Sequence, residues 1–304
     1  MLYWPFNDRR PDRQYRDLLS RILLEGRRVQ TQQNEPALRV IGHQMRFDLA
    51  NGFPIVTERD LVSAPEGKQS QFAMAIAELC AFLNGAQTLT QMQAFGCGWW
   101  KPWVTAEKCA RRGLEPGDLG PGSYGAAFRR FPTAEGEPFD QMTHLVEQIR
   151  ELPHLRTHVI SPWIPQYIGR GKGKTQKVVV APCHGWVHVF VDEEQETLSL
   201  HHFQRSADAP VGLVFNLIQY AALTLMLAQV TGYRAEELVF TLSDAHIYRD
   251  QRQDVEEMLE TTPRRFPTVT LDPSVSDLFA FRPQHFTVSD YEPSLERRMI
   301  WTPV

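Results

Sequence analysis

The 304-residue sequence is poor in cysteine and has no large excess of charge of either sign. Its four cysteines form no paired framework and no CxxC motif, so a disulfide-stapled secreted protein is not expected. The formal net charge of −4 provides no general attraction to nucleic acid or to an anionic membrane. We therefore expect neither a nucleic-acid partner nor a membrane partner.

A long uninterrupted hydrophobic run is also missing. The most apolar stretch, residues 211–230, contains Asn216, Gln219 and Gln229, and three amides are costly in a membrane interior. Charges and Pro5 interrupt the first ten residues, which argues against a secretory leader. These absences predict a cytoplasmic protein in which residues 211–230 form a buried helix.

Hydrophobic residues make up 42% of the chain, which is enough for a sizeable core. Apolar residues at helical spacing predict helices over residues 12–25, 71–83, 139–152, 213–231 and 251–260. Extended stretches are expected over residues 38–49, 158–163, 178–192, 197–204, 238–247 and 263–273. Mixed helices and strands without a repeat or a linker predict one continuous α+β domain over residues 1–304, with a large sheet.

The most informative stretch runs from Ala181 to Asp250. It contains, in order, Ala181-Pro-Cys-His-Gly, Gln204-Arg-Ser-Ala-Asp208, Phe215-Asn216 and Asp244-Ala-His-Ile-Tyr248. A nearby positive charge stabilises a thiolate, so the pKa of Cys183 should fall below its usual value of about 8.5 if the fold brings Arg205 to it. Arg205 and Ser206 also provide the guanidinium fork and the hydroxyl that suit a phosphate.

This order of motifs resembles the thymidylate synthase family, whose strongest signature is Pro-Cys-His, then Gln-Arg-Ser-x-Asp, then Phe-Asn. The resemblance covers the chain from about Tyr15 to Val304 through further segments: Gly42-His-Gln-Met-Arg-Phe-Asp48, Gly52-Phe-Pro-Ile-Val-Thr57, Glu78-Leu79, Gly117-Asp-Leu-Gly-Pro121, Tyr124-Gly125, Tyr291-Glu-Pro and Thr302-Pro-Val. It implies a thymidylate synthase-like fold, with a large mixed β-sheet flanked by helices and with the sheets packed back to back in a homodimer. Insertions relative to this pattern are expected near residues 63–69 and 168–177.

The resemblance implies folate-dependent one-carbon transfer to C5 of a pyrimidine nucleoside monophosphate. In that family a cysteine, here Cys183, adds to C6 of the base, and 5,10-methylenetetrahydrofolate is the co-substrate. Methylation of dUMP to dTMP is the best match, and hydroxymethylation of dUMP or dCMP is the alternative. The two differ in whether hydride or water reaches the last intermediate. A cysteine hydrolase or a non-catalytic nucleotide binder fits less well, because neither explains Glu78, Asn216 and Arg205 together.

The resemblance also assigns roles at the reacting base. Glu78, Tyr124 and His184 match a proton-handling network around the thiol. Asn216 matches the residue that reads the base, because an amide pairs with the O4 and N3–H of uracil, whereas aspartate is associated with cytidylate enzymes. Without the resemblance, each of these would be read as an ordinary core or surface residue.

The remaining assignments concern the sugar, the phosphate and the folate. His246 and Tyr248, on one side of an extended segment, match the residues that hold the 3′-hydroxyl. Arg156, Gln204, Arg205 and Ser206 complete the predicted nucleotide-binding set. The predicted folate set is Asp208, which matches the pterin ligand and is also placed among the catalytic residues, with Trp100, Trp103, Gly212 and Arg59.

The predicted phosphate site departs from the family pattern. Gln32 stands where the family has an arginine, and Arg156-Thr157 stands where the partner subunit normally supplies an arginine pair. Each lost charge-assisted hydrogen bond is worth about 1.5–3 kcal/mol. The basic connector Arg170, Lys172 and Lys174 is a candidate replacement, with a solvated hairpin tip as the alternative.

Three histidines, His188, His201 and His202, stand where the family usually has other residues. With Cys183 they suggest zinc, but neighbouring strand positions form no defined ligand spacing. We therefore expect no metal.

Overall fold

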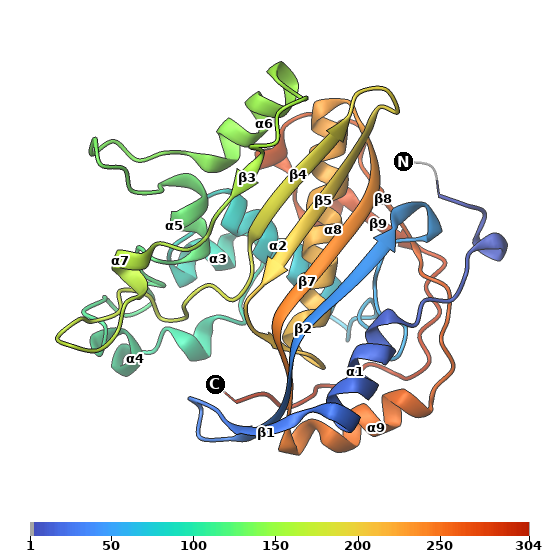
Figure 1. Cartoon of the computed structure of the whole chain (residues 1–304), viewed down its shortest axis with the longest axis horizontal. Coiled ribbons are helices and arrows are strands. Elements are labelled where there is room, and N and C mark those ends of the chain that lie inside the picture. The colour runs from blue at the N-terminus through green and yellow to red at the C-terminus, as the bar shows by residue number, and fades with distance from the viewer. Residues whose placement is uncertain (1–2, 304) are drawn as a thin grey trace.

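The computed structural model describes residues 3–303, so Met1, Leu2 and Val304, the last residue of the predicted closing tail, lie outside the described residues. Its main feature is a mixed β-sheet with helices packed against one face (Figure 1). The strands of this sheet, in spatial order, are β1 (Arg27–Gln30), β2 (Pro36–Asp48), β7 (Arg234–Tyr248), β5 (Thr197–Gln204), β4 (Trp186–Asp192) and β3 (Val159–Ile160), with β6 (Ala207–Asp208) paired to β7. β5 and β6 run parallel to β7, and the other pairs are antiparallel. The predicted α+β class with a large mixed sheet is confirmed.

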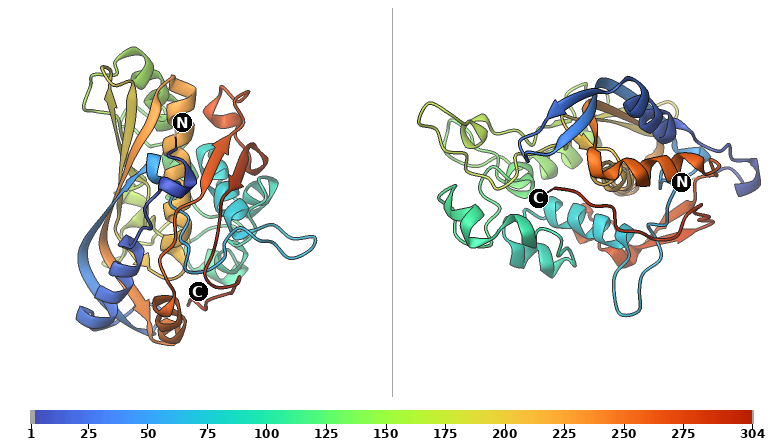
Figure 2. Two further views of the ribbon diagram at one scale, coloured as in Figure 1. Left: turned by 90° about the vertical axis from the view of Figure 1, so that its right-hand side faces the viewer. Right: turned by 90° about the horizontal axis from the view of Figure 1, so that it is seen from below.

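The helices form a second and a third layer behind the sheet (Figure 2). Their bounds are α1 (Gln14–Glu25), α2 (Gln71–Leu83), α3 (Leu89–Ala94), α4 (Ala106–Ala110), α5 (Tyr124–Arg129), α6 (Gln141–Glu151), α7 (Pro165–Ile168), α8 (Gly212–Thr231) and α9 (Arg252–Glu260). α8 packs on β5 and β7, α2 packs on α8, and α1 contacts α9. A separate hairpin of β8 (Thr268–Leu271) and β9 (Phe286–Ser289) lies on the side of the molecule away from the large sheet.

Helix α8 is the core of the fold. It is apolar on all sides, which is typical of a helix surrounded by protein. It is the one helix among the described residues that is long and apolar enough to cross a membrane, and 89% of its most apolar window is buried inside the domain. It ends at Gly232, whose φ of 84° gives the left-handed conformation that favours glycine at this position. The prediction of a buried helix with three amides is confirmed.

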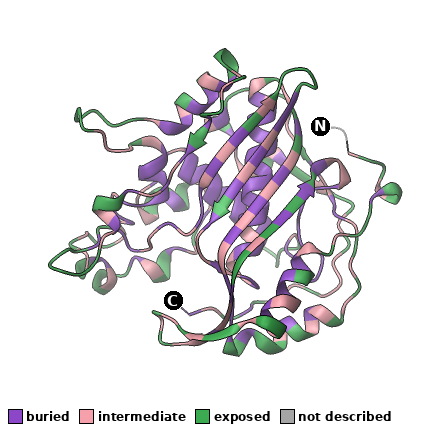
Figure 3. Cartoon of the chain, in the orientation of Figure 1, coloured by how far each residue is buried: buried purple, intermediate pink, exposed green. Residues whose placement is uncertain are grey.

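The open face of the sheet is visible at the front of Figure 3, where exposed and half-buried residues alternate with buried ones. Register places Val159, Phe190 and Phe203 on this same face. Their side chains are 52%, 44% and 37% exposed, respectively. The opposite face of the same strands carries the buried residues that pack on α8.

Three of the expected strands are shorter than predicted. Of residues 178–192 only Trp186–Asp192 form a strand, because Pro182 has no N–H to donate and Gly185 has a φ of 102°. Cys183 therefore lies on a loop before β4 and not within a strand. Residues 158–163 contain only the two-residue β3, which stops before Pro162, and residues 263–273 contain only β8.

Candidate active site

The side chains of Cys183 and Arg205 meet in a half-buried site between the start of β4 and the end of β5. Nη2 of Arg205 lies 3.3 Å from the sulfur of Cys183. The same guanidinium donates from Nε to the carbonyl oxygen of Pro182 at 2.7 Å and from Nη2 to that of Ala181 at 2.8 Å. It also lies over the ring of Trp163, with 5.6 Å from Cζ to the ring centroid. The contact that the sequence motif requires is present.

The prediction that the pKa of Cys183 falls is wrong for this unliganded structure. Burial raises the pKa of the thiol more than the positive charge of Arg205 lowers it. Asp244 raises it further, while hydrogen bonds from Tyr124 and Arg205 favour the thiolate. The sequence revealed the charge near the thiol but not how little water surrounds it.

A stacked aromatic wall supports the backbone of Cys183. The hydroxyl of Tyr124, at the start of α5, accepts a hydrogen bond from the Cys183 N–H at 2.7 Å. The Tyr124 ring is stacked between Phe82 and His184, with centroids 4.7 Å and 4.4 Å away. His184 in turn has Nδ1 2.6 Å from the hydroxyl of Tyr220, and burial lowers the pKa of His184 to about 3. His184 is therefore a neutral imidazole at neutral pH.

Glu78, on α2, is a buried carboxylate surrounded by N–H donors. Its Oε1 accepts from the indoles of Trp99 at 2.6 Å and Trp100 at 2.5 Å, and its Oε2 accepts from Gln219 at 2.6 Å. Burial raises the pKa of Glu78, and these three donors oppose the rise. Trp100, predicted to line a folate site, is buried against Phe82 and Tyr124 with its N–H on this carboxylate.

Asn216 lies one turn before Gln219 on α8 and is part of a buried chain of amides. Its Nδ2 donates to Oε1 of Gln219 at 2.9 Å, and its Oδ1 accepts from Nε2 of Gln204 at 3.0 Å. Nε2 of Gln204 also donates to the carbonyl oxygen of Ser206 at 3.0 Å. The cost of burying an asparagine is offset by these bonds, which leave one N–H and one oxygen lone pair free.

His246 and Tyr248 lie on the same side of β7, with ring centroids 5.0 Å apart. Nδ1 of His246 is 2.7 Å from a carboxylate oxygen of Asp244. A carboxylate accepts hydrogen bonds, so Nδ1 donates to Asp244 and Nε2 is left for another partner. Asp208 on β6 is in register with His246. The fold therefore places His246, predicted to bind the sugar, beside Asp208, predicted to bind the pterin ring.

The carboxylate of Asp208 is held by residues near the end of the chain. Gln251 donates to both of its oxygens at 3.0–3.1 Å, and the hydroxyl of Thr302 donates to Oδ2 at 2.6 Å. The Gln251 amide also donates to the carbonyl oxygen of Trp301 at 2.9 Å. Burial raises the pKa of Asp208. Residues 301–302 therefore cover one side of Asp208, the residue predicted to bind the pterin ring of folate.

The predicted folate residue Arg59 is a buried cation with no acidic side chain within 4.0 Å among residues 3–303. It donates to the side chain of Gln71 and to the carbonyl oxygen of Pro210, and its Nε has no partner among those residues. Its guanidinium lies 6.0 Å from the ring centroid of Phe215. A buried donor beside an aromatic ring suits a ligand that offers an acceptor and a flat ring system.

Trp103 and Gly212 complete the predicted folate set. Trp103 is half-buried at the end of a short 3-10 helix, with the ammonium of Lys108 5.2 Å from its ring centroid. Gly212 begins α8, and a Cβ at this position would lie 4.0 Å from the Cβ of Asp208, which is ordinary contact. Space therefore does not require glycine there.

The basic connector between α7 and Cys183 reaches the place of the missing arginine. Nη1 of Arg170 lies 3.5 Å from Oε1 of Gln32, and Nε of Arg170 donates to Gln176. Lys172 and Lys174 are exposed, around a turn closed by a bridge between Gly171 and Lys174. The lysines thus form a solvated hairpin tip, and Arg170 lies next to Gln32, while its role as a replacement phosphate ligand stays a prediction.

Two other predicted phosphate ligands have free polar groups. The Ser206 hydroxyl and the Arg156 guanidinium form no hydrogen bond with the described residues, and Arg156 is exposed. Within residues 3–303 no cluster of three His, Cys, Asp or Glu side chains is arranged to hold a metal ion. His188, His201 and His202 instead bond to Arg156, Thr241 and Gly185, respectively.

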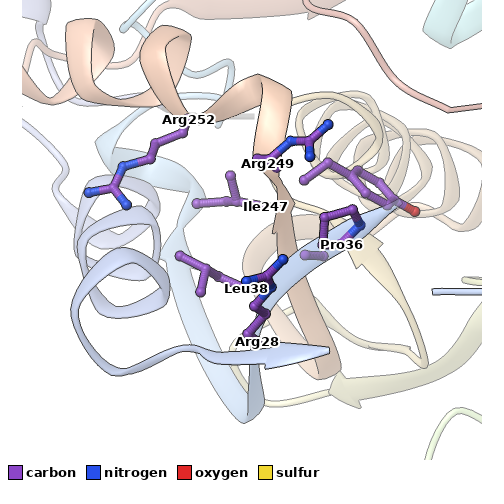
Figure 4. A pocket seen from close by; sticks show the side chains of 8 residues that line it. Arg28, Pro36, Leu38, Ile247, Arg249 and Arg252 are labelled. Carbon is purple, nitrogen blue, oxygen red and sulfur yellow. The ribbon is translucent and has the colours of Figure 1, made fainter. Parts of the chain in front are cut away.

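A separate surface pocket of about 220 Å³ lies beyond Tyr248, between the β1–β2 hairpin and α9 (Figure 4). Its floor contains Leu38 and Ile247, which are paired in register. Arg28, Arg249 and Arg252 lie around this apolar floor. The pocket shares only Tyr248 with the predicted site.

Sequence reasoning missed several residues that hold the site together: Trp99, Gln219, Tyr220, Gln251 and Thr302. Gln219 had a visible signal, because an amide in the middle of an apolar helix requires a buried partner. The other four have no local signal, since their partners lie far away in the sequence.

A half-buried thiol beside a guanidinium, with a buried carboxylate and a partly free amide in the same region, is an arrangement that can support covalent catalysis. The sequence model of the family described as thymidylate synthase matches residues 13–301, and the chain therefore belongs to that family. Its members are enzymes that act on pyrimidine nucleotides, with methylenetetrahydrofolate as co-substrate.

Proposed function

We propose that this protein transfers a one-carbon unit to C5 of dUMP, giving dTMP, through a covalent bond between the Cys183 sulfur and C6 of the base. The observation that carries the proposal is the 3.3 Å contact between Arg205 and the Cys183 sulfur. Glu78 supports it, because Trp100 connects this carboxylate to the Tyr124 wall beside the thiol.

Because the thiolate is the nucleophile, the thiol first gives up its proton to solvent water, and burial, which raises its pKa, opposes this loss while Arg205 favours it. The sulfur lone pair then forms the bond to C6, and the electron pair of the C5=C6 double bond moves toward C5 and O4. Arg205 stabilises the thiolate on attack and again when the sulfur leaves. Tyr124 holds the Cys183 backbone through both events.

Glu78 is the acceptor for the C5 proton in this proposal. Burial raises its pKa, which makes the carboxylate a stronger proton acceptor than an exposed one. The indoles of Trp99 and Trp100 fix one oxygen, and Gln219 fixes the other while leaving it a free lone pair. That lone pair can receive the proton directly or through one water molecule.

The sugar and the phosphate extend along β7 and the end of β5. Nε2 of His246 and the hydroxyl of Tyr248 suit the 3′-hydroxyl, and Arg205 with Ser206 suits the phosphate. Arg170 supplies a cation next to Gln32, where a guanidinium is missing from the family pattern. Arg156 is proposed to reach the phosphate in the partner subunit.

Residues 3–303 offer a set that fits the folate co-substrate: Asp208 with its carboxylate, Arg59 with its unpartnered Nε, and Trp103 with its half-buried ring. Methylenetetrahydrofolate supplies the one-carbon unit when it is bound. Asp208 and Arg59 orient polar edges of the ligand, and residues 301–302 shield the site from water.

The assembly we propose is a cytoplasmic homodimer. The open face of the large sheet carries exposed Val159, Phe190 and Phe203, and burying them against a second copy removes apolar area from water. This face also holds His188, whose Nε2 lies 3.2 Å from the Arg156 carbonyl oxygen. Arg156 is thus next to the proposed interface.

Hydroxymethylation of dUMP or dCMP is the alternative reaction. The packing of Thr302 on Asp208 and the burial of Trp100 favour exclusion of water, and so favour methylation. The test is to incubate the protein with methylenetetrahydrofolate and, in turn, dUMP, dCMP or CMP, and to weigh the products by mass spectrometry. Methylated dUMP with release of dihydrofolate is expected. A hydroxymethyl product with tetrahydrofolate would establish the alternative, and no product with any nucleotide would refute both.

A further inference from the structure

Gln219 connects the buried carboxylate of Glu78 to the amide of Asn216. It is 1% exposed and lies three residues after Asn216 on α8, so both side chains are on one face of the helix. Its Nε2 donates to Oε2 of Glu78 at 2.6 Å and to the carbonyl oxygen of Ala75 at 3.2 Å. Its Oε1 accepts from Nδ2 of Asn216 at 2.9 Å.

The partners of Gln219 leave its amide a single orientation. A carboxylate and a carbonyl oxygen only accept hydrogen bonds, so the NH₂ group of Gln219 must face Glu78 and Ala75. Oε1 of Gln219 must therefore face Asn216, and Asn216 must present its own NH₂ group to it. Reversing Asn216 would place two oxygens opposite each other.

Gln204 imposes the same orientation from the other side of Asn216. Its NH₂ group faces the carbonyl oxygen of Ser206 and so donates to Oδ1 of Asn216 at 3.0 Å. Reversing Asn216 would bring two NH₂ groups together here. Each buried mismatch leaves polar groups unpaired, which is costly in a site where Asn216 and Gln204 are 6% and 2% exposed.

We propose that Gln219 is a specificity-determining positioning residue, which locks Asn216 in the orientation that reads a uracil edge. This inference rests on the proposed function, in which Asn216 faces N3 and position 4 of the base. The free N–H of Asn216 lies on the side of Gln219 and Glu78. In the proposed reaction Glu78 accepts the proton from C5, and C4 is the ring atom bonded to C5, so this N–H faces position 4. A donor is thus presented to position 4 and an acceptor to N3. Uracil offers O4 and N3–H, whereas cytosine offers the reverse.

The test is equilibrium binding of dUMP and of dCMP by calorimetry, which requires neither folate nor turnover. The wild-type protein should bind dUMP more tightly than dCMP. Gln219→Met, which keeps the length but removes all three side-chain hydrogen bonds, should reduce this preference by about tenfold or more, because the lock is worth at least one buried hydrogen bond. The matched control is Gln229→Met on the same helix, whose amide donates to Asp272 and Val275, away from the site. Its preference should equal that of the wild type.

A second variant separates orientation from packing. In Gln219→Glu the new carboxyl group and Glu78 would share a proton between them, and the other oxygen of residue 219 would still accept from Asn216. Gln219→Glu should therefore keep the preference for dUMP even though the shared proton at Glu78 weakens turnover. An unchanged preference in a folded Gln219→Met protein, or a Gln219→Glu variant that loses the preference, would overturn the inference. If the wild type binds dUMP preferentially but transfers no carbon unit, the proposed function fails while the inference stands. Binding of neither nucleotide by the wild type would overturn both.

Discussion

Arg205 and Cys183 are joined twice, because the guanidinium contacts the sulfur and the Arg205 N–H donates to the Cys183 carbonyl oxygen at 2.8 Å. The arginine is also bonded to the carbonyl oxygens of Ala181 and Pro182. The loop that carries the thiol is therefore held at several points by the residue that directly follows β5.

Replacing the thiol should abolish turnover without unfolding the protein. Cys183 is half-buried on a loop, so Cys183→Ala removes little packing, while no other group in the site can form the bond to C6. We expect at least about a thousandfold loss of kcat, as for other covalent nucleophiles, with an unchanged thermal transition. Cys109→Ala, which alters a buried cysteine outside the site, is the control and should stay active. A Cys183→Ala protein with most of its activity would exclude covalent catalysis by this residue.

The reactivity of Cys183 should depend on pH above the ordinary thiol range. Its pKa is raised by burial, so the thiol is protonated at neutral pH and the thiolate fraction rises with pH, about tenfold per unit below the pKa. Alkylation by iodoacetamide should follow this curve, with Cys183→Ala as background. Because the charge of Arg205 lowers the pKa, Arg205→Met should move the curve to higher pH. Arg150→Met, whose arginine bonds to Val230 elsewhere, should not move it.

Replacing Asn216, the residue proposed to read the base, should change which nucleotide the enzyme prefers. Asn216→Asp replaces the N–H that faces position 4 with an acceptor, which suits the amino group of cytosine and repels O4 of uracil. In a competition between dUMP and dCMP, we expect the ratio of kcat/KM values to shift by about tenfold or more toward dCMP. Asn84→Asp, at the end of α2, is a matched control outside the site. An unchanged ratio would remove the argument for uracil.

Arg170 should contribute to phosphate binding. Arg170→Glu reverses a charge next to Gln32 and should weaken dUMP binding by about tenfold, through loss of a charge-assisted bond. Binding of deoxyuridine, which has no phosphate, should change little. Lys172→Glu at the hairpin tip and Arg111→Glu just after α4 test whether general charge matters instead. Equal losses in all three variants would discard a specific role for Arg170.

Much of the fold was predictable, because its signals are local. The helical spacing of apolar residues located α1, α2, α6, α8 and α9, and the amides of α8 identified a core helix. The loop before β4 was not predicted, because an apolar run such as residues 178–180 resembles a strand until Pro182 and Gly185 are placed in three dimensions.

The site was predictable only in part. The motifs indicated that Cys183 and Arg205 meet, and the structure places them together, while the catalytic roles remain predictions. The pKa of Cys183 was predicted in the wrong direction, because desolvation depends on the whole fold and not on the nearest charge. The bonds of Gln219 to Glu78 and of Thr302 to Asp208 join residues 141 and 94 positions apart, and no local pattern reports them.

The tether from Tyr124 includes a hydrogen bond to the main-chain N–H of Cys183. This hydrogen bond therefore does not depend on which atom the side chain of residue 183 carries. Selenocysteine at this position would keep the same main-chain hydrogen bond. The reacting atom at position 183 can thus be exchanged while the backbone that positions it keeps its hydrogen bond to Tyr124.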